Sequence, residues 1–255
     1  MSITITIVQT DVFWKNSEAN RLHIEEQLWD MEEDTDLIIL PELFSTGFTF
    51  TDKIAEPHNL HTFKWMKQMA SLKDASIMGS ILIKDKGLFY NRCYCVSPSG
   101  TFQTYDKRHL FTLSDESKFC QSGSNQILFN VKGWLIMPSI CYDIRFPVWS
   151  RNTTEYDIII NIANWPSERK EAWQTLLKAR SIENQCYTVG VNRVGEDENK
   201  LIYNGESCIH SFDGSTILKL NNQQTIKTII LYKKDLINYR ANFPFLQDQD
   251  NFSLM

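Results

Sequence analysis

The chain has 255 residues, of which 42% are hydrophobic and 22% are charged. This composition is typical of a globular protein, and the length allows a substantial core in one large domain or two small ones. The net charge of -5 comes without a basic block or stripe, which argues against nucleic acid or an anionic membrane surface as the main partner. No apolar run approaches the roughly 20 residues that a transmembrane helix needs.

The first residues and the cysteines indicate where the protein works. Isoleucine alternates with threonine over residues 3–7, which predicts a strand and not a signal peptide. Six cysteines are scattered along the chain, at positions 93, 95, 120, 141, 186 and 208. Without an export signal we expect free thiols in a reducing compartment, and therefore a cytoplasmic protein.

Strands and helices alternate in the first half of the chain. Residues 36–40 are almost entirely apolar, which predicts a short central strand covered on both faces. Turn signals separate three further strands that we expect to form a meander. The predicted elements are a strand at 3–8, helices at 16–34 and 58–72, and the meander strands at 76–84, 88–97 and 101–105.

The second half repeats this alternation. Its longest helix carries an apolar stripe, as a helix packed on a sheet does. The predicted strands are 126–131, 133–140, 156–162, 186–192, 206–212, 215–220 and 224–232, and the predicted helices are 167–184 and 233–242. The pattern predicts an α/β protein with mixed sheets, and we expect one domain over residues 1–255.

Reactive side chains follow several of the predicted strands directly. Glu42, Cys141 and Asn164 each come just after an apolar strand, and Lys107 follows the strand that ends at Tyr105. Because strand ends of this kind gather the site in open α/β sheets, we expect these side chains to lie together.

A cysteine, a carboxylate and a lysine form a coherent set for acyl transfer. The Cys141 thiolate is the expected nucleophile, with its pKa lowered by a nearby ammonium. The Glu42 carboxylate can take the thiol proton and return it to a leaving amine. Lys107 and the Tyr142 backbone N–H can stabilise the oxyanion, and Glu116 can fix either the lysine or the first glutamate.

The presence of each of these residues can also be explained without a catalytic role. Cys141 can be a packing residue, Glu42 can belong to a solvated turn, and Lys107 can be part of a surface charge cluster. His109 can act as a base for Cys141, but we favour a hydrogen-bonded, half-buried imidazole.

Cys93 and Cys95 lie on the same face of a predicted strand. No second pair of cysteines or histidines stands at ligand spacing, so we expect these two thiols to pack in the core and not to bind a metal.

Three segments together resemble a known family. They are residues 40–44 (LPELF), 105–111 (YDKRHLF) and 139–147 (SICYDIRFP), which are similar in order and approximate spacing to the signature segments of the nitrilase superfamily of carbon–nitrogen hydrolases. The resemblance covers essentially the whole chain. Within the superfamily it points to the omega-amidase branch, through residues 41–48, 164–166, 192–195 and 239–244.

The resemblance implies a four-layer αββα sandwich with two mixed sheets that pairs into a homodimer, with an extension from about residue 233 packing at the dimer interface. It implies a triad of Glu42, Lys107 and Cys141, and it makes Glu116 the match for a second glutamate found in many members. It implies neither a metal nor an organic cofactor.

The omega-amidase branch further implies hydrolysis of small carboxylate-bearing amides, such as 2-oxoglutaramate and 2-oxosuccinamate, through a thioester on Cys141. The alternatives are a carbon–nitrogen hydrolase for an N-carbamoyl amine, an aliphatic amide or a nitrile, and, more remotely, a non-catalytic binding protein on the same fold.

A substrate carboxylate calls for a cation in the pocket. Arg169 is the first candidate, and Arg145 is the second because we expect Asp143 to hold it. Aromatic side chains are the expected walls of a small pocket, namely those of Phe44, Phe48 and Trp165.

Overall fold

A computed structural model describes residues 1–254 of the chain. Its first sheet has seven strands in the order β15-β1-β2-β4-β5-β6, with β3 paired to β4. β1, β2 and β4 run parallel, whereas β15, β5 and β6 are antiparallel to their neighbours. The strands are β1 (Ser2–Gln9), β2 (Leu37–Ile39), β3 (Glu56–Pro57), β4 (Ser76–Asp85), β5 (Leu88–Val96), β6 (Phe102–Asp106) and β15 (Thr225–Tyr232).

The second sheet has six strands in the order β14-β13-β10-β9-β8-β7. Its centre is parallel, from β8 through β9 to β10, and the strands outside this centre are antiparallel. The strands are β7 (Phe129–Val131), β8 (Trp134–Ile140), β9 (Ile158–Ala163), β10 (Tyr187–Asn192), β13 (Cys208–His210) and β14 (Thr216–Lys219). The predicted mixed character of both sheets is confirmed.

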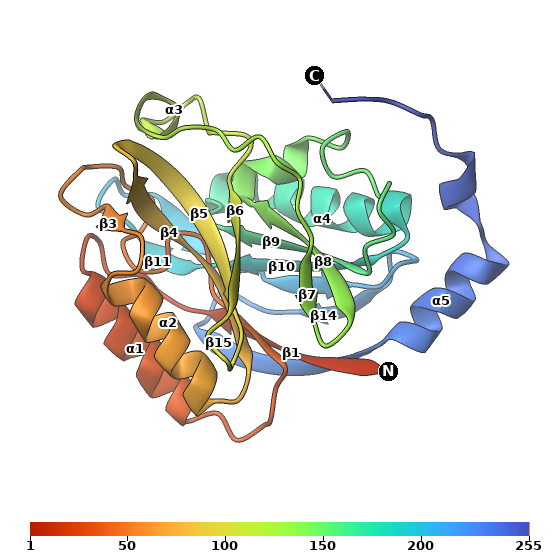
Figure 1. The fold of residues 1–255 in the computed structure, drawn as a ribbon, viewed down its shortest axis with the longest axis horizontal. Coiled ribbons are helices and arrows are strands. Elements are labelled where there is room, and N and C mark those ends of the chain that lie inside the picture. The colour runs from red at the N-terminus through yellow and green to blue at the C-terminus, as the bar shows by residue number, and fades with distance from the viewer. Residues whose placement is uncertain (255) are drawn as a thin grey trace.

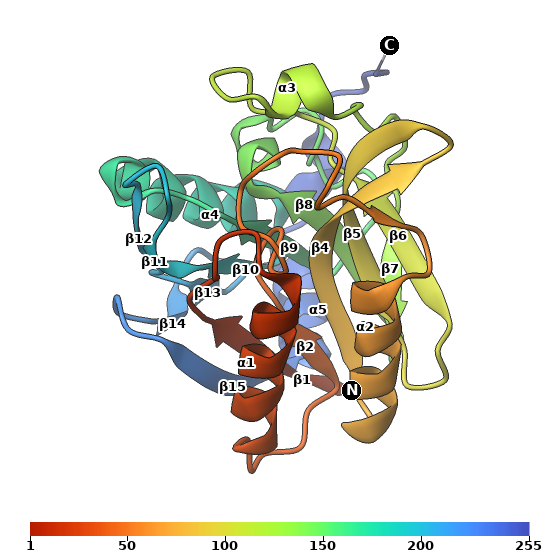
Figure 2. The ribbon, with the colours of Figure 1, turned by 90° about the vertical axis from the view of Figure 1, so that its left-hand side faces the viewer.

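Helices cover the outer faces of the two sheets. α1 (Ser17–Trp29) and α2 (His61–Leu72) lie side by side over the first sheet, and α4 (Lys170–Asn184) packs on the second (Figures 1 and 2). The order helix, sheet, sheet, helix confirms the predicted four-layer αββα sandwich. The remaining helical segments are α3 (Glu116–Phe119), α5 (Lys233–Asn242), η1 (Cys141–Arg145), η2 (Ser167–Arg169) and η3 (Phe245–Asp248).

The apolar pattern of each strand explains its place between the layers. In β2, Leu37 and Ile39 face the core between the sheets, while Ile38 faces the core under α1 and α2. The strand is therefore covered on both faces, as predicted. Cys93 and Cys95 of β5 both join the core between the sheets, which confirms that they pack there.

A two-stranded hairpin of β11 (Val194–Glu196) and β12 (Ile202–Asn204) lies outside both sheets, and the sequence analysis did not predict it. Each strand has three residues, which is too short for an alternating pattern to show. The first predicted helix ends at Trp29 and not at residue 34, because residues 30–36 are mostly acidic and include a single apolar side chain, that of Met31.

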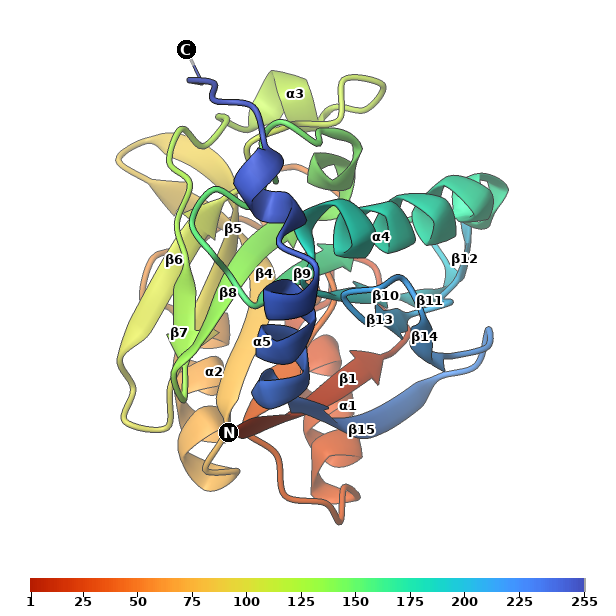
Figure 3. The same cartoon turned by 90° about the vertical axis from the view of Figure 1, so that its right-hand side faces the viewer.

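The C-terminal part of the chain runs across one end of both sheets (Figure 3). α5 buries only Leu236 fully, while Ile237 and Phe243 remain exposed, as do Phe245 and Phe252 beyond it. The expected dimer interface in this segment stays a prediction. Among residues 1–254, no helix is long and apolar enough to span a bilayer.

Candidate active site

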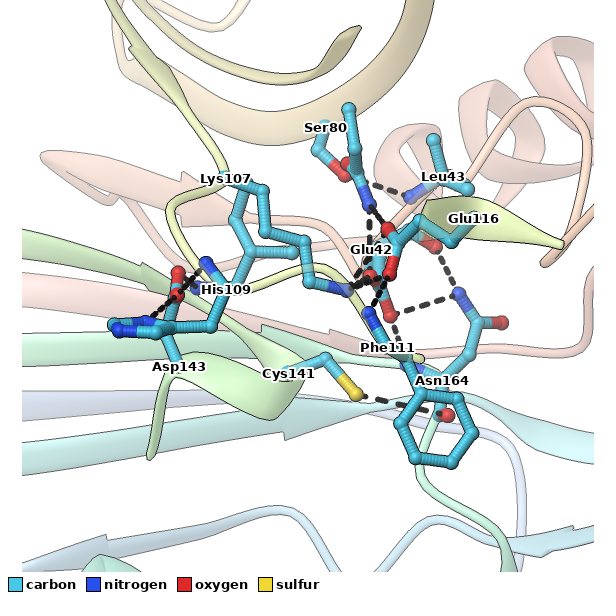
Figure 4. A network of polar contacts seen from close by, with 12 residues as sticks. Glu42, Leu43, Ser80, Lys107, His109, Phe111, Glu116, Cys141, Asp143 and Asn164 are labelled. Atoms are coloured by element: carbon cyan, nitrogen blue, oxygen red, sulfur yellow. Dashed lines mark hydrogen bonds and ion pairs between the residues drawn. The ribbon is translucent and has the colours of Figure 1, made fainter. Parts of the chain in front are cut away.

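Strands from both sheets deliver polar side chains to one edge of the sandwich. Glu42 follows β2 and Lys107 follows β6 in the first sheet, while Cys141 follows β8 and Asn164 follows β9 in the second. The structure brings all four together (Figure 4). The two sheets thus supply different halves of one site.

Lys107 lies between two glutamates. Its Nζ donates to Oε1 of Glu42 at 2.8 Å and to Oε1 and Oε2 of Glu116 at 3.0 and 2.9 Å. All three side chains have 0% exposure. A buried charge is tolerated only when it is paired and hydrogen-bonded, and this cluster meets that condition.

Neutral donors also bond to the oxygens of both carboxylates. Nδ2 of Asn91 donates to Oε1 of Glu42 at 2.8 Å and to Oε1 of Glu116 at 3.0 Å. The backbone N–H of Asn164 donates to Oε2 of Glu42 at 2.9 Å, and that of Phe111 donates to Oε2 of Glu116 at 2.8 Å. The bonds from Asn91 and Phe111 lower the pKa of Glu116, against the effect of its burial.

Asn91 is the member of this cluster that the sequence analysis missed. It lies within β5 and is fully buried, so it has none of the turn signals that marked the other site residues. The one available signal was a polar side chain at a position of the strand that faces the interior.

The charged groups of the cluster shift each other's pKa. Burial alone would lower the pKa of Lys107, but the charges of Glu116 and Glu42 raise it well above its usual value. Burial raises the pKa of Glu116, and the nearby Lys107 ammonium opposes this shift. Lys107 is therefore an ammonium at neutral pH.

Cys141 stands at a strained turn between β8 and η1. Its φ is +47°, in the left-handed region that residues with a side chain seldom adopt. Because η1 begins at Cys141, the following N–H, that of Tyr142, belongs to the first turn and has no partner within the helix. The thiol is 9% exposed, and its Sγ lies 3.9 Å from the carbonyl oxygen of Asn164.

The surroundings of Cys141 favour a neutral thiol. Burial raises the pKa of Cys141 well above its usual value, the charge of Glu42 raises it further, and Lys107 opposes both. The expectation of a lowered pKa is wrong, because burial together with the charges of Glu42 and Glu116 outweighs the single ammonium. Any thiolate must form by proton transfer to a neighbour, and Glu42 is the carboxylate with the largest effect on it.

His109 does not face the thiol. Its Nδ1 lies 2.8 Å from Oδ1 of Asp143, and its ring stacks on Phe146 at a centroid distance of 3.7 Å. The half-buried, hydrogen-bonded imidazole that we favoured is what the structure contains.

A cavity of about 910 Å³ opens over the thiol. Its lining includes four of the five predicted pocket residues, namely Phe48, Arg145, Trp165 and Arg169, together with Cys141 and Tyr142. The prediction for Phe44 is wrong. Phe44 has 0% exposure and packs against Trp65 under the helices, because its side chain points to the outer face of the first sheet.

The two arginines of the cavity rest on aromatic rings. The guanidinium of Arg145 lies 5.0 Å from the ring centroid of Trp165, and that of Arg169 lies 5.4 Å from that of Phe111. The expected pair of Arg145 and Asp143 is wrong, because the Asp143 carboxylate accepts hydrogen bonds from Tyr105, His109 and Ile140. Within residues 1–254 neither arginine forms an ion pair with a carboxylate.

Residues 1–254 contain no group of three or more histidine, cysteine or carboxylate side chains arranged to hold a metal ion. The chemical groups of the site are a thiol, an ammonium, two carboxylates and two amides. Such a set can move a proton, attack a carbonyl and hold negative charge.

Comparisons with known proteins agree with this geometry. The sequence profile of the carbon-nitrogen hydrolase family matches residues 4–236. The chain is 38% identical to omega-amidase YafV of Escherichia coli strain K12 over 253 residues, which cover 99% of this chain and 98% of that protein. It is 29% identical to 2-oxoglutaramate amidase of Bacillus subtilis strain 168, over 97% of this chain and 98% of that protein.

Among solved structures, the fold matches a CN-hydrolase superfamily protein of Xanthomonas campestris that has an arsenic adduct in its active site. The TM-score is 0.96 with 36% identity, and the match covers 100% of both chains. The family match spans most of the chain, and the similar proteins share its full length. The chain belongs to the carbon–nitrogen hydrolase family.

Proposed function

We propose that this protein is a cysteine-dependent amidase that hydrolyses omega-amides of 2-oxo acids, such as 2-oxoglutaramate and 2-oxosuccinamate, to the 2-oxo dicarboxylic acid and ammonia. The observation that carries the reaction is the buried cluster of Glu42, Lys107 and Glu116 beside the Cys141 thiol, at a cavity lined by that thiol. Full-length relatives named omega-amidase and 2-oxoglutaramate amidase support the substrate class.

The first step forms an acyl-enzyme. Because the resting thiol is neutral, Glu42 takes its proton as Sγ of Cys141 attacks the amide carbonyl carbon. The carbonyl oxygen becomes an oxyanion, held by Nζ of Lys107 and the N–H of Tyr142. Glu42 then gives the proton to the nitrogen, the carbon–nitrogen bond breaks, and ammonia leaves a thioester on Cys141.

The second step uses water and the same residues. Glu42 takes a proton from a water molecule that attacks the thioester carbonyl, and Lys107 and Tyr142 hold the second oxyanion. The carbon–sulfur bond then breaks and the proton returns to Sγ of Cys141. In our proposal Glu116 and Asn91 keep Lys107 and Glu42 in place through both steps.

The walls of the cavity provide the carboxylate site. Arg169 is our first candidate and Arg145 the second, since each guanidinium rests on an aromatic ring and is free to form a charge-assisted pair. Phe48 and Trp165 limit the width of the cavity beside them. A short amide that ends in a carboxylate fits this combination of a thiol at one end and a cation at the other.

The test is an ammonia-release assay with matched substrates. We expect 2-oxoglutaramate to be turned over much faster than glutamine, an N-carbamoyl amino acid or a simple nitrile. Turnover of the nitrile alone would exclude the omega-amidase assignment and favour a nitrilase with the same triad.

A non-catalytic protein on this fold makes a different prediction for the thiols. After brief exposure to a thiol-directed acylating reagent, mass spectrometry should find Cys141 modified before the other five cysteines, all of which are buried. Equal labelling of all six would favour the binding protein.

We also propose that residues 1–255 act as one catalytic domain that forms a homodimer through the segment from about residue 233. The exposed apolar side chains of Ile237, Phe243 and Phe245 support this interface. Light scattering should give the mass of two chains, and replacing Phe243 by aspartate should give that of one. Six free thiols are compatible with our proposal of a cytoplasmic location.

A further inference from the structure

The two groups that must act on one carbonyl come from different sheets. Lys107 follows β6 and Cys141 follows β8, and within residues 1–254 no hydrogen bond joins their side chains. An oxyanion donor is effective only within about 0.5 Å of its productive position. The site therefore needs something that holds the Lys107 segment and the Cys141 segment in register.

The carboxylate of Asp143 is placed to do this. Asp143 is 1% exposed and lies two residues after Cys141. Its Oδ1 accepts from the backbone N–H of His109 at 2.8 Å and lies 2.8 Å from the ring Nδ1 of the same residue. Its Oδ2 accepts from the hydroxyl of Tyr105 at 2.8 Å and from the backbone N–H of Ile140 at 3.0 Å.

These partners flank both reactive residues. Tyr105 lies two residues before Lys107 and His109 two residues after it, while Ile140 directly precedes Cys141. One carboxylate is thus bonded to residues on both sides of Lys107 and to the residue before Cys141, and Figure 4 shows its bonds to His109.

The Tyr105 hydroxyl is itself fixed. Its oxygen accepts from the indole Nε1 of Trp149 at 3.1 Å and from the backbone N–H of Arg108 at 3.3 Å. The ring of His109 is held between the stacked Phe146 and the edge-on Trp149. Tyr105 and His109 therefore have little freedom to move with the Asp143 carboxylate if it shifts.

We propose that Asp143 is a positioning residue that keeps the ammonium of Lys107 and the Sγ of Cys141 at the spacing that carbonyl attack requires. This inference rests on the proposed function, because it assumes that both groups act on one acyl carbon. The role needs a carboxylate: four donors point at its two oxygens, and an asparagine would turn its own N–H2 towards some of them.

The test compares Asp143→Asn with Asp157→Asn. Asp157 is a matched control at the far end of the same sheet, since it is buried, precedes β9 and accepts from the N–H of Leu135 at 2.8 Å and from Lys233 at 2.7 Å. The readout is acylation of Cys141 by p-nitrophenyl acetate. Glu42 takes the thiol proton, Sγ bonds to the acetyl carbon, and the ester carbon–oxygen bond breaks to release p-nitrophenolate. The release gives a coloured burst, which is measured at a temperature where every variant is folded.

We expect Asp143→Asn to slow the burst about 100-fold, the loss typical of a 1 Å misplacement, with little change in the half-saturating ester concentration. Asp157→Asn should acylate within about twofold of wild type even if its melting temperature falls equally. Equal burst rates for the two variants would overturn the proposal.

A double-variant cycle separates positioning from a general loss of structure. In a Lys107→Met background the ammonium is gone, so adding Asp143→Asn should cost little more than Lys107→Met alone. If the fold-losses in burst rate of the two single variants multiply in the double variant, Asp143 acts independently of Lys107 and the proposal is contradicted.

If Asp143→Asn does not fold, Tyr105→Phe gives the same test with one hydrogen bond removed. It should slow acylation about tenfold in the wild-type background and not at all in Lys107→Met; an unchanged burst in both would overturn the inference. Because the assay uses an ester, it tests the positioning role independently of the proposed function. If the burst depends on Asp143 but the protein turns over no amide, the amidase function is refuted and the positioning role stands.

Discussion

The buried charge cluster beside Cys141 and the wall of the cavity are built in opposite ways. In the cluster, the charged groups of Glu42, Lys107 and Glu116 have no exposure, and each is held by short hydrogen bonds. On the wall, Arg145 is exposed and Arg169 is half-buried, and both rest on aromatic rings with no carboxylate partner among residues 1–254.

This difference indicates that the reaction and the selection of the substrate are carried out by different parts of the site. Charges with no access to water are stable only in one arrangement, because loss of a partner leaves a buried charge uncompensated. The buried cluster is therefore suited to a fixed reaction on a carbon–nitrogen bond. The guanidinium groups on the wall keep part of their hydration and remain free to pair with a ligand, so the wall is suited to substrate selection. Changes in the cluster should lower kcat, and changes on the wall should raise KM.

The largest expected effect is at Cys141. Cys141→Ala removes the nucleophile, and since no other thiol lines the cavity, ammonia release should fall to the background rate. The substitution removes one sulfur atom from a packed site, so the thermal unfolding midpoint should change little. More than a few per cent of the wild-type rate in the folded variant would refute the thioester mechanism.

Lys107→Met should be next, with effects on both rate and stability. Loss of an oxyanion donor should lower kcat about 100- to 1,000-fold. Loss of the shared cation leaves two buried carboxylates together, so the free energy of unfolding should fall by about 3–5 kcal/mol. Lys118→Met is the control, since Lys118 pairs with Asp115 at an exposed site in the same loop and should change neither quantity.

The stability loss in Lys107→Met should depend on pH. The pKa of Glu116 is raised in the folded protein by burial, and Lys107 opposes this. A carboxyl with a raised pKa stabilises the fold most below its usual value and loses that contribution as the pH rises through the raised value. Without Lys107 the pKa rises further, so urea unfolding should show a larger deficit at pH 8 than at pH 5. An equal deficit at both would contradict the account of the cluster.

A smaller effect is expected at Asn91. Asn91→Leu removes two hydrogen bonds to carboxylates, each typically worth about 1.5–3 kcal/mol, and should lower kcat at least tenfold without raising KM. Asn91→Asp should be slower than Asn91→Leu, because it adds a third carboxylate beside two others. Steady-state kinetics on 2-oxoglutaramate distinguish these results. A wild-type kcat in Asn91→Leu would show that Asn91 has no role in catalysis.

The smallest effect belongs to the wall. Arg169→Leu should raise KM for 2-oxoglutaramate about tenfold, the change expected from about 1.4 kcal/mol of lost binding, and leave kcat nearly unchanged. KM for a neutral amide such as propionamide should not change. If Arg145→Leu gives this pattern and Arg169→Leu does not, the two arginines exchange roles.

The sequence predicted the parts of the fold and of the site that follow from local patterns, such as apolar runs in strands and polar side chains after strand ends. Central strands such as β2 are apolar throughout. Lys107 and Cys141 stand directly after a strand and Glu42 shortly after one, where side chains of a site collect. The helix at residues 233–242 was also predicted with its observed bounds.

The errors come from features that depend on direction in space. Phe44 follows Glu42 closely but points to the other face of the sheet, and Asp143 bonds to Tyr105 and His109 instead of Arg145. Asn91 was missed because its position in β5 is like that of any strand residue. The pKa of Cys141 depends on how deeply the thiol is buried and on how many carboxylates lie near the one ammonium, and sequence order reveals neither.

The central claim is that burial and the charge of Glu42 keep Cys141 as a neutral thiol, and that Glu42 takes the thiol proton only during attack. It is tested most directly by the rate of Cys141 alkylation by iodoacetamide at pH 8.5, in wild type and in Glu42→Gln. Removing the carboxylate charge should lower the pKa of the thiol, so alkylation should become faster while amide turnover is lost. If alkylation slows in Glu42→Gln, or if turnover survives, the account is contradicted.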